Sequence, residues 1–321
     1  MIVGDELERW LADRPAQRET RGRIDAFATA WNAGPVHRAI AGAIASAPAG
    51  NAEAVAAVIA NLFADDFWLD ALVDGLAEAL REDPYFEAPF RHIDSDIHSG
   101  LVVYEDEHVS IAAGVSRAGQ LAAKKTAKRG ALSIGFSGQL DVFKFVKAGR
   151  ARLSFWECPP IAEDFSAATA GRCRPAGTRE LKDGEIVLVD GRRQSFVIEH
   201  AAANMIVLQA TVKAGRAPLA VEYDSETRAY VGCSAADDSA SRIQMISTLL
   251  RKLDCAAAFP VIAAFVDHPN FFVRWHVMKE LLGLDAMAAL PHLRDMAAHD
   301  PHPEARATAA AVLAQLERKA A

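Results

Sequence analysis

Histidine and acidic residues alternate over one short stretch that could bind a transition metal. His92, Asp94, Asp96 and His98 occupy every second position of the segment RHIDSDIHSG. In a single extended strand all four side chains would lie on one face, and imidazole and carboxylate groups are ligands for iron, manganese or zinc. The Ser and Gly residues among them are equally typical of an exposed turn capped by the aspartates. The pattern therefore leaves two interpretations open, a metal site and a surface turn.

A second group of residues could bind a small polar ligand. Its members are small or polar and come from separate segments: Ser133, Ser137, Arg192, Arg193, Gln194 and His200. Arginine guanidinium groups suit carboxylate or phosphate, and small serine side chains leave room inside a barrel. We expect these residues to form a pocket for a small polar molecule or a peptide group. The alternative for either arginine is an ion pair with Asp190 at the rim.

Three large aromatic residues lie within five positions near the C-terminus, namely Phe271, Phe272 and Trp275. At about 100° per residue they cannot all point to one side of a helix. We expect at least one of them to face the rest of the chain or a partner protein, because aromatic side chains of this size dominate interfaces.

Composition and missing motifs exclude several classes of function. The sequence contains no GxSxG, P-loop, GxGxxG, HExxH or EF-hand pattern, which are the usual signatures of acyl transfer, nucleotide hydrolysis, dinucleotide redox chemistry and metal-dependent proteolysis. The formal net charge of -7 disfavours nucleic acid or an anionic membrane as the main partner. The four cysteines form no CxxC pair. No stretch is long and apolar enough to span a membrane and no signal peptide is visible, so we expect a cytoplasmic protein.

Periodicity divides the chain into three parts and predicts an α+β multidomain protein. Residues 1–88 show apolar residues at helical spacing and predict three or four helices. Residues 89–236 contain short β runs separated by turns, which is typical of a sandwich or barrel. Residues 237–321 return to helical spacing after an expected cap at Asp237, with Ile243, Ile246, Leu250 and Leu253 along one stripe.

The C-terminal part contains an internal repeat. The segment PNFFVRWHVMKEL starting at Pro269 aligns with PHPEARATAAAVL starting at Pro301, an offset of 32 residues that places Arg274 on Arg306. This pattern resembles HEAT-type helical repeats over roughly residues 255–317. The resemblance implies stacked helix pairs that serve either as a protein-binding surface or as a packing support for the central domain.

The central part resembles the cupin superfamily in two places. DVFKFVKAGRARLSFWE has a strand, a turn at Gly149 and a returning strand, and KDGEIVLVDGRRQSF has Gly184 and Gly191 at the positions of the family's turn glycines. The resemblance implies a jelly-roll β-barrel. The family's metal ligands are not matched, because SIGFSGQLDVFKFV contains no histidine and Gln194 stands where the later motif has one.

Two classes of function follow from these observations. The favoured one is a binding or accessory protein without metal or other cofactor, whose barrel recognises a small polar ligand or peptide and whose helical repeats contact a partner protein. The alternative is a cupin-type metalloenzyme, an oxygenase or isomerase, holding iron or manganese. Its ligands would be nonstandard and drawn from His92, His98, His108 and His200, with Glu157 or Glu199 as carboxylate. A purely structural scaffold is a third possibility.

Overall fold

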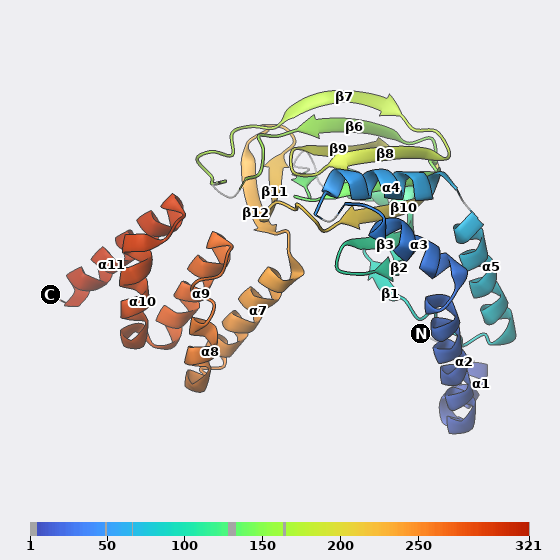
Figure 1. Ribbon diagram of the computed structural model, residues 1–321, viewed down its shortest axis with the longest axis horizontal. Helices are drawn as coiled ribbons and strands as arrows, with labels where there is room; N and C mark the ends of the chain where they lie inside the picture. The colour runs from blue at the N-terminus through green and yellow to red at the C-terminus, as the bar shows by residue number, and fades with distance from the viewer. Residues whose placement is uncertain (1–4, 49, 66, 128–132, 163–164, 321) are drawn as a thin grey trace.

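The structure is a computed structural model that describes residues 5–48, 50–65, 67–127, 133–162 and 165–320. Figure 1 shows an arch in which N-terminal helices form one end, β-sheets form the middle and C-terminal helices form the other end. The predicted order of helical region, antiparallel β domain and helical repeats is confirmed. Among the described residues, none of the helices combines the length and the apolar character needed to span a bilayer.

In the described part of the N-terminal region there are five helices, one more than the three or four that we predicted. The helices are α1 (Asp5–Ala12), α2 (Arg14–Asn32), α3 (Pro35–Ala45), α4 (Ala52–Ala64) and α5 (Phe67–Glu82). Asn51 caps α4 by accepting a hydrogen bond from the Ala54 amide at 2.9 Å, as its residue type predicts. The fully buried Ile59 and Phe63 then fix α4 against the outer face of the largest sheet.

The β domain has the strand order of a jelly roll. Its strands are β1 (Arg91–Asp94), β2 (His98–Glu105), β3 (Val109–Ser116), β4 (Ser133–Phe136), β5 (Leu140–Lys147), β6 (Arg152–Glu157), β7 (Arg174–Glu180), β8 (Glu185–Asp190), β9 (Gln194–His200), β10 (Met205–Val212), β11 (Leu219–Asp224) and β12 (Tyr230–Ala235). One sheet runs β1-β2-β3-β10-β5-β8. The strands β7-β6-β9 form a second sheet and β4-β11-β12 a third. β4 lies beside β9, where the Ser195 hydroxyl on β9 donates to the Gly135 carbonyl on β4.

With β4 lying beside β9, the strands from β3 to β10 fall into two layers in the orders 3-10-5-8 and 7-6-9-4. Two interlocking Greek keys produce this arrangement, and it is the jelly roll shared by cupins. The predicted domain limits, 88/89 and 236/237, fall between α5 and β1 and between β12 and the next helix.

The segment from His92 to His98 is a hairpin rather than one extended strand. β1 ends at Asp94 and β2 begins at His98, and Asp94 pairs with Ser99 across the turn. The Ser95 amide donates to the His98 carbonyl at 2.8 Å, and the His98 amide donates to the Ser95 hydroxyl at 3.0 Å. The chain reverses because the serine satisfies the backbone locally. Of the two interpretations that the sequence left open, the single extended strand with four ligand-type side chains on one face is therefore wrong, and the surface turn agrees with the structure.

The C-terminal helices stack as repeated pairs. They are α7 (Asp238–Lys252), α8 (Phe259–Ala263), α9 (Phe271–Leu284), α10 (Ala286–His299) and α11 (Pro303–Ala320), with a short 3-10 turn at Ala256–Ala258. Arg274 donates to the carbonyls of His268 and Pro269, each at 2.8 Å, and Arg306 donates to those of Asp300 and Pro301. The arginine that recurs in the sequence thus satisfies the carbonyls of the turn before its own helix.

Candidate ligand-binding site in the barrel

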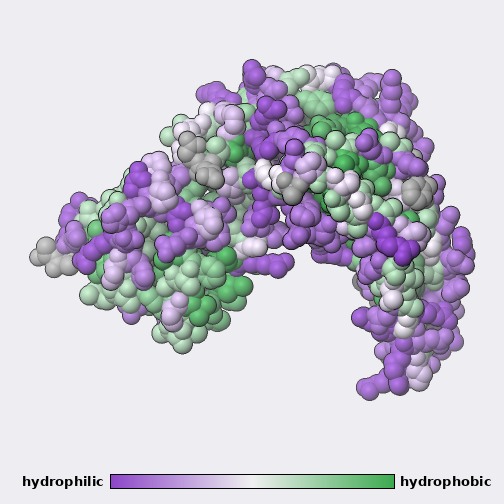
Figure 2. Space-filling model, viewed as in Figure 1, coloured by the Kyte–Doolittle hydropathy of each residue, from purple (hydrophilic) through white to green (hydrophobic). Residues whose placement is uncertain are grey.

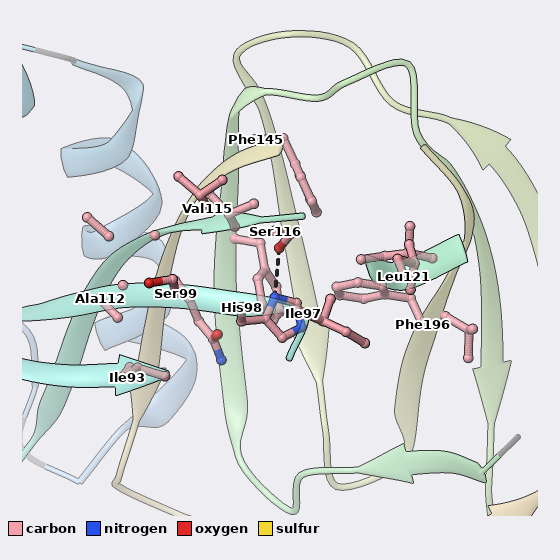
Figure 3. A pocket seen from close by; sticks show the side chains of 18 of the residues that line it. Ile93, Ile97, His98, Ser99, Ala112, Val115, Ser116, Leu121, Phe145 and Phe196 are labelled. Carbon is pink, nitrogen blue, oxygen red and sulfur yellow. Dashed lines mark hydrogen bonds between the residues drawn. The ribbon is translucent and has the colours of Figure 1, made fainter. Parts of the chain in front are cut away.

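A cavity of about 520 Å³ lies inside the jelly roll and is lined mainly by apolar side chains. Its walls come from β1, β2, β3, β4, β5, β9 and β10, with Leu121 of α6 (Ala118–Ala127) added from outside the sheets. Figure 3 shows His98 and Ser116 pointing toward each other in this cavity, with Phe196 and Leu121 at another side. Small-molecule sites are commonly cavities of about 300–1,000 Å³ with apolar walls and few polar groups.

Strand alternation explains which side chains reach the cavity. On β10, Leu208 and Ala210 are fully buried on the outer side, in the core cluster that contains α4. Val207 and Gln209 are their neighbours in the chain and therefore face inward, where both line the cavity. On β5 the same alternation turns Phe143 and Phe145 inward. These aromatic rings pack with Phe196 of β9, at 5.0 Å and 6.3 Å between ring centroids.

A buried carboxylate orients the polar end of the cavity. Asp141 of β5 accepts hydrogen bonds from Thr211 at 2.7 Å, from Ser137 at 2.9 Å and from the Gln209 amide nitrogen at 3.3 Å. Burial raises the pKa of Asp141, against the opposing effect of these three donors. Gln209 also lines the cavity, so its side-chain amide is a polar group of the cavity wall that Asp141 holds in place.

The second polar feature is a pair of neighbouring strands at the cavity wall. His98 of β2 lies opposite Ser116 of β3, and its Nδ1 is 2.8 Å from the Ser116 hydroxyl. Two residues further along, Gly100 lies opposite Gly114. A Cβ at Gly100 would stand 2.6 Å from the Ala113 carbonyl oxygen and 2.9 Å from the Gly114 Cα. The two glycines therefore let β2 and β3 pack closely where they border the cavity.

The structure does not bring the predicted ligand-binding residues into one pocket. Ser133 lines the barrel cavity, whereas Ser137 is bound to Asp141. Arg192, Arg193 and Gln194 line a different cavity, of about 590 Å³, which also borders Glu53 of α4. His200 lies exposed at the end of β9, opposite Arg152.

Both arginines form ion pairs instead, as the alternative interpretation stated. Arg192 lies 2.7 Å from Asp190 and 2.7 Å from Glu53, and Arg193 lies 3.1 Å from Asp190. Burial acts to raise the pKa of Asp190, but the hydrogen bonds from Arg192 outweigh it and hold that pKa below the usual value. Arg192 thus joins the β8–β9 turn to α4, because the helix places a carboxylate within its reach.

The candidate metal ligands are dispersed as well. His92 and His108 are exposed, with Glu87 at 3.7 Å and Glu107 at 3.4 Å respectively, and only His98 borders the cavity. The two candidate carboxylates are also occupied, since Glu157 pairs with Arg174 at 2.7 Å and Glu199 accepts from Ser154 at 2.5 Å. Within the described ranges, no three His, Cys, Asp or Glu side chains are grouped so that they could hold a metal ion.

The three C-terminal aromatic residues contact other parts of the same chain. Phe271 and Phe272 pack against the barrel's second core cluster, which contains Phe136 and Tyr223. Trp275 packs into a separate cluster between α9, α10 and α11. His302 stacks on Phe271, with ring centroids 3.6 Å apart and planes inclined by 5°. These contacts join the helical repeats to the barrel.

Comparison with known proteins gives a partial family assignment. A family model described as HEAT repeats matches residues 232–314, so the C-terminal part consists of HEAT repeats, as predicted. No curated protein matches the chain in sequence.

Several solved structures are similar to the chain. A cupin domain from Bordetella pertussis Tohama I is 11% identical, over 38% of this chain and 99% of that one, with a TM-score of 0.22. A sugar phosphate isomerase of the cupin superfamily from Silicibacter pomeroyi DSS-3 is 14% identical, over 44% and 79%, with a TM-score of 0.24. An HTH_3 family transcriptional regulator from Vibrio cholerae is 13% identical, over 61% and 89%, with a TM-score of 0.22.

The residues that define the cavity were mostly missed in the sequence. Phe143, Phe145, Phe196 and Gln209 all lie in segments correctly predicted as strands. Their inward direction follows from the alternation on each strand, once the outer face is known to be the one that packs on α4. The sequence did not show which face of each strand points outward, and Gln209 and Thr211 are polar positions in a mostly apolar run.

Proposed function

We propose that the chain is a non-catalytic binding protein whose barrel holds one small molecule with an apolar body and a polar end. The observation that supports it is the cavity of about 520 Å³, with aromatic walls and the Gln209 amide group held in place by Asp141. An apolar body would pack on Phe143 and Phe196, and a hydroxyl or N–H group would donate to Gln209 Oε1. The site accordingly favours a hydroxylated or amine-bearing aromatic or aliphatic compound over an anion.

The HEAT repeats support an accessory role for the same protein. Repeats of this type form protein-interaction modules, and here they pack directly on the barrel through Phe271 and Phe272. We propose that the helical module contacts a partner protein while the barrel holds the ligand.

A cavity-filling variant tests the barrel proposal. Ala112 lines the cavity from β3, so Ala112→Phe should fill part of it, whereas Val231→Phe places the same ring on the exposed side of β12. We expect phenols, indoles or medium-chain alcohols to raise the melting temperature of the native protein and of Val231→Phe, because a ligand that binds only the folded state stabilises it. Ala112→Phe should lose that shift while keeping its circular dichroism spectrum. Full ligand shifts in Ala112→Phe would refute the barrel cavity as the site.

Metal analysis separates this proposal from the metalloenzyme alternative. Protein purified without chelator is expected to contain far less than one equivalent of iron or manganese. One tightly held metal per chain would contradict a binding protein without metal. In that case, metal content in the single alanine variants of His92, His98, His108 and His200 would identify the ligands.

A further inference from the structure

The first helix of the HEAT module leaves an apolar stripe uncovered. Met245, Ile246 and Leu249 on α7 and Leu253 at its C-cap are 68%, 55%, 54% and 66% exposed. They lie within an arc of about 100° on the helix, which also contains the exposed Arg242 one turn before Met245. The predicted single stripe is therefore split in two, because Ile243 and Leu250 pack into the module while Ile246 and Leu253 face outward. Figure 2 shows hydrophobic surface over α7 and α8, where the module borders the hollow under the arch.

The opposite end of the module differs. Helical repeats need a polar outer face on the terminal helix to end the stack in water. Among the described side chains of α11, no large hydrophobic residue is exposed. α11 thus ends the stack, whereas α7 presents the apolar side that a further helix would normally cover. Contiguous apolar surface of this kind marks an interaction site.

The charges beside the stripe indicate what covers it. Asp238 and Lys252 are exposed and lie seven residues before and after Met245. Seven residues are close to two helical turns, so the three side chains share one face over about 21 Å. If a second α7 lies antiparallel on the first, with the twofold axis at Met245, each Asp238 meets the other chain's Lys252. A twofold interface requires this self-complementary pattern.

We infer that the α7 stripe is a homodimer interface, in which two copies of this chain pair their α7 helices antiparallel about Met245. The four apolar side chains, extended by the 61% exposed Val261 of α8, supply the centre of the contact. Asp238 and Lys252 close it at both ends. Stable interfaces have this composition, with an apolar centre and a polar rim, over about 800 Å² per partner. The inference concerns a surface separate from the barrel cavity and does not depend on what the cavity binds.

Sedimentation velocity of the full chain over a wide concentration range tests the interface. We expect a dimer for the native protein, a monomer for Leu249→Glu, and a dimer for Leu80→Glu, which alters an equally exposed leucine on α5. A native monomer at every concentration, or a Leu249→Glu dimer, would overturn the inference.

Charge exchange tests the antiparallel arrangement without disturbing the apolar stripe. Asp238→Lys and Lys252→Asp should each weaken dimerisation by about tenfold or more in dissociation constant, since each puts like charges opposite one another. The double variant should restore it. Failure of the double variant to restore dimerisation would refute the proposed register.

Cross-linking supplies a readout that does not depend on affinity. In a background with Cys233 and Cys255 replaced by Ser, Met245→Cys should form a covalent dimer under mild oxidation, because the residue lies on the twofold axis. Met287→Cys on α10 is a control of similar exposure and should not form one. Equal cross-linking of both variants, or none at Met245→Cys, would contradict the pairing.

Discussion

Arg274 and Asp300 form a buried, two-pronged ion pair between successive HEAT repeats. Arg274 Nε donates to Asp300 Oδ2 at 2.8 Å and Nη2 donates to Oδ1 at 2.7 Å, with the side chains only 8% and 2% exposed. The remaining nitrogen of the guanidinium binds the carbonyls of His268 and Pro269. One side chain thus fixes its own turn and the turn of the next repeat.

We expect Arg274→Ala to lower the free energy of unfolding by about 3–5 kcal/mol, because it leaves the Asp300 carboxylate buried without its partner. Arg306→Ala, at the equivalent position of the next repeat, should cost less. Within the part of the chain that the structure describes, Arg306 binds the carbonyls of Asp300 and Pro301 and no carboxylate. Urea unfolding followed by circular dichroism measures both. Equal losses would mean that the ion pair adds nothing beyond the carbonyl contacts.

The same pair predicts a loss of stability in acid. Burial acts to raise the pKa of Asp300, but the hydrogen bonds from Arg274 and from the His302 amide outweigh it and lower that pKa. A carboxyl whose folded pKa is depressed contributes its full stability above the unfolded pKa of about 4, and loses it as pH falls through the folded value. The melting temperature should therefore decline below about pH 5.

Asp300→Asn should make that decline shallower, starting from a lower melting temperature at neutral pH. The control is Asp295→Asn, an exposed carboxylate on α10. Melting curves at a series of pH values compare the three proteins. An unchanged acid slope in Asp300→Asn would show that other carboxyl groups govern the response.

Close packing of β2 on β3 predicts a sharp difference between two glycines. Gly100→Ala should destabilise the barrel by about 1–3 kcal/mol, because its Cβ meets backbone atoms that cannot move independently of the sheet. Gly135→Ala on β4 has no atom within 4 Å of the new methyl group and should be nearly neutral. Chemical denaturation measures both changes. Similar costs at the two sites would contradict the close approach of β2 and β3.

Trp275→Ala should reduce stability, since its ring packs among α9, α10 and α11. We expect a loss of up to about 3 kcal/mol, because the residue is only partly buried. Thermal unfolding and a pull-down on the same variant separate packing from partner capture. An unchanged melting temperature with lost partners would assign the ring to an external interface. Unchanged results in both would mean that it serves neither role.

Local signals predicted most of the fold. Each of these signals involves residues close together in the sequence: the caps at Asn51 and Asp237, the recurring Arg274 and Arg306, and the apolar runs of the inner strands. β7 was missed because all seven of its residues are exposed and include Pro175 and Gly177, so no alternation marks it. All four residues of β1 are exposed as well, so the sequence did not decide there between a strand and a turn.

The candidate site was less predictable because its contacts join distant positions. Arg192 was expected at a ligand, but Glu53, 139 residues earlier, neutralises it once α4 packs on the barrel. Gln209 acquires its orientation from Asp141, 68 residues away. Neither of these pairings can be predicted from the residues around them in the sequence. His98 and Ser116 are different, because they lie opposite each other on two strands that follow one another in the chain.

Phe271 and Phe272 pack across the domain boundary predicted at Ala236, which affects any attempt to divide the chain there. Both rings belong to the HEAT module by sequence and to the barrel's second core cluster by packing. A gene fragment ending at Ala236 would encode a barrel whose second core cluster lacks its contacts with Phe271 and Phe272. A fragment starting there would keep the His302 stack on Phe271 but would expose more of both rings to water. The barrel and the HEAT module therefore cannot be exchanged independently. A chimera that keeps one of them must also keep the part of the other that packs around Phe271 and Phe272.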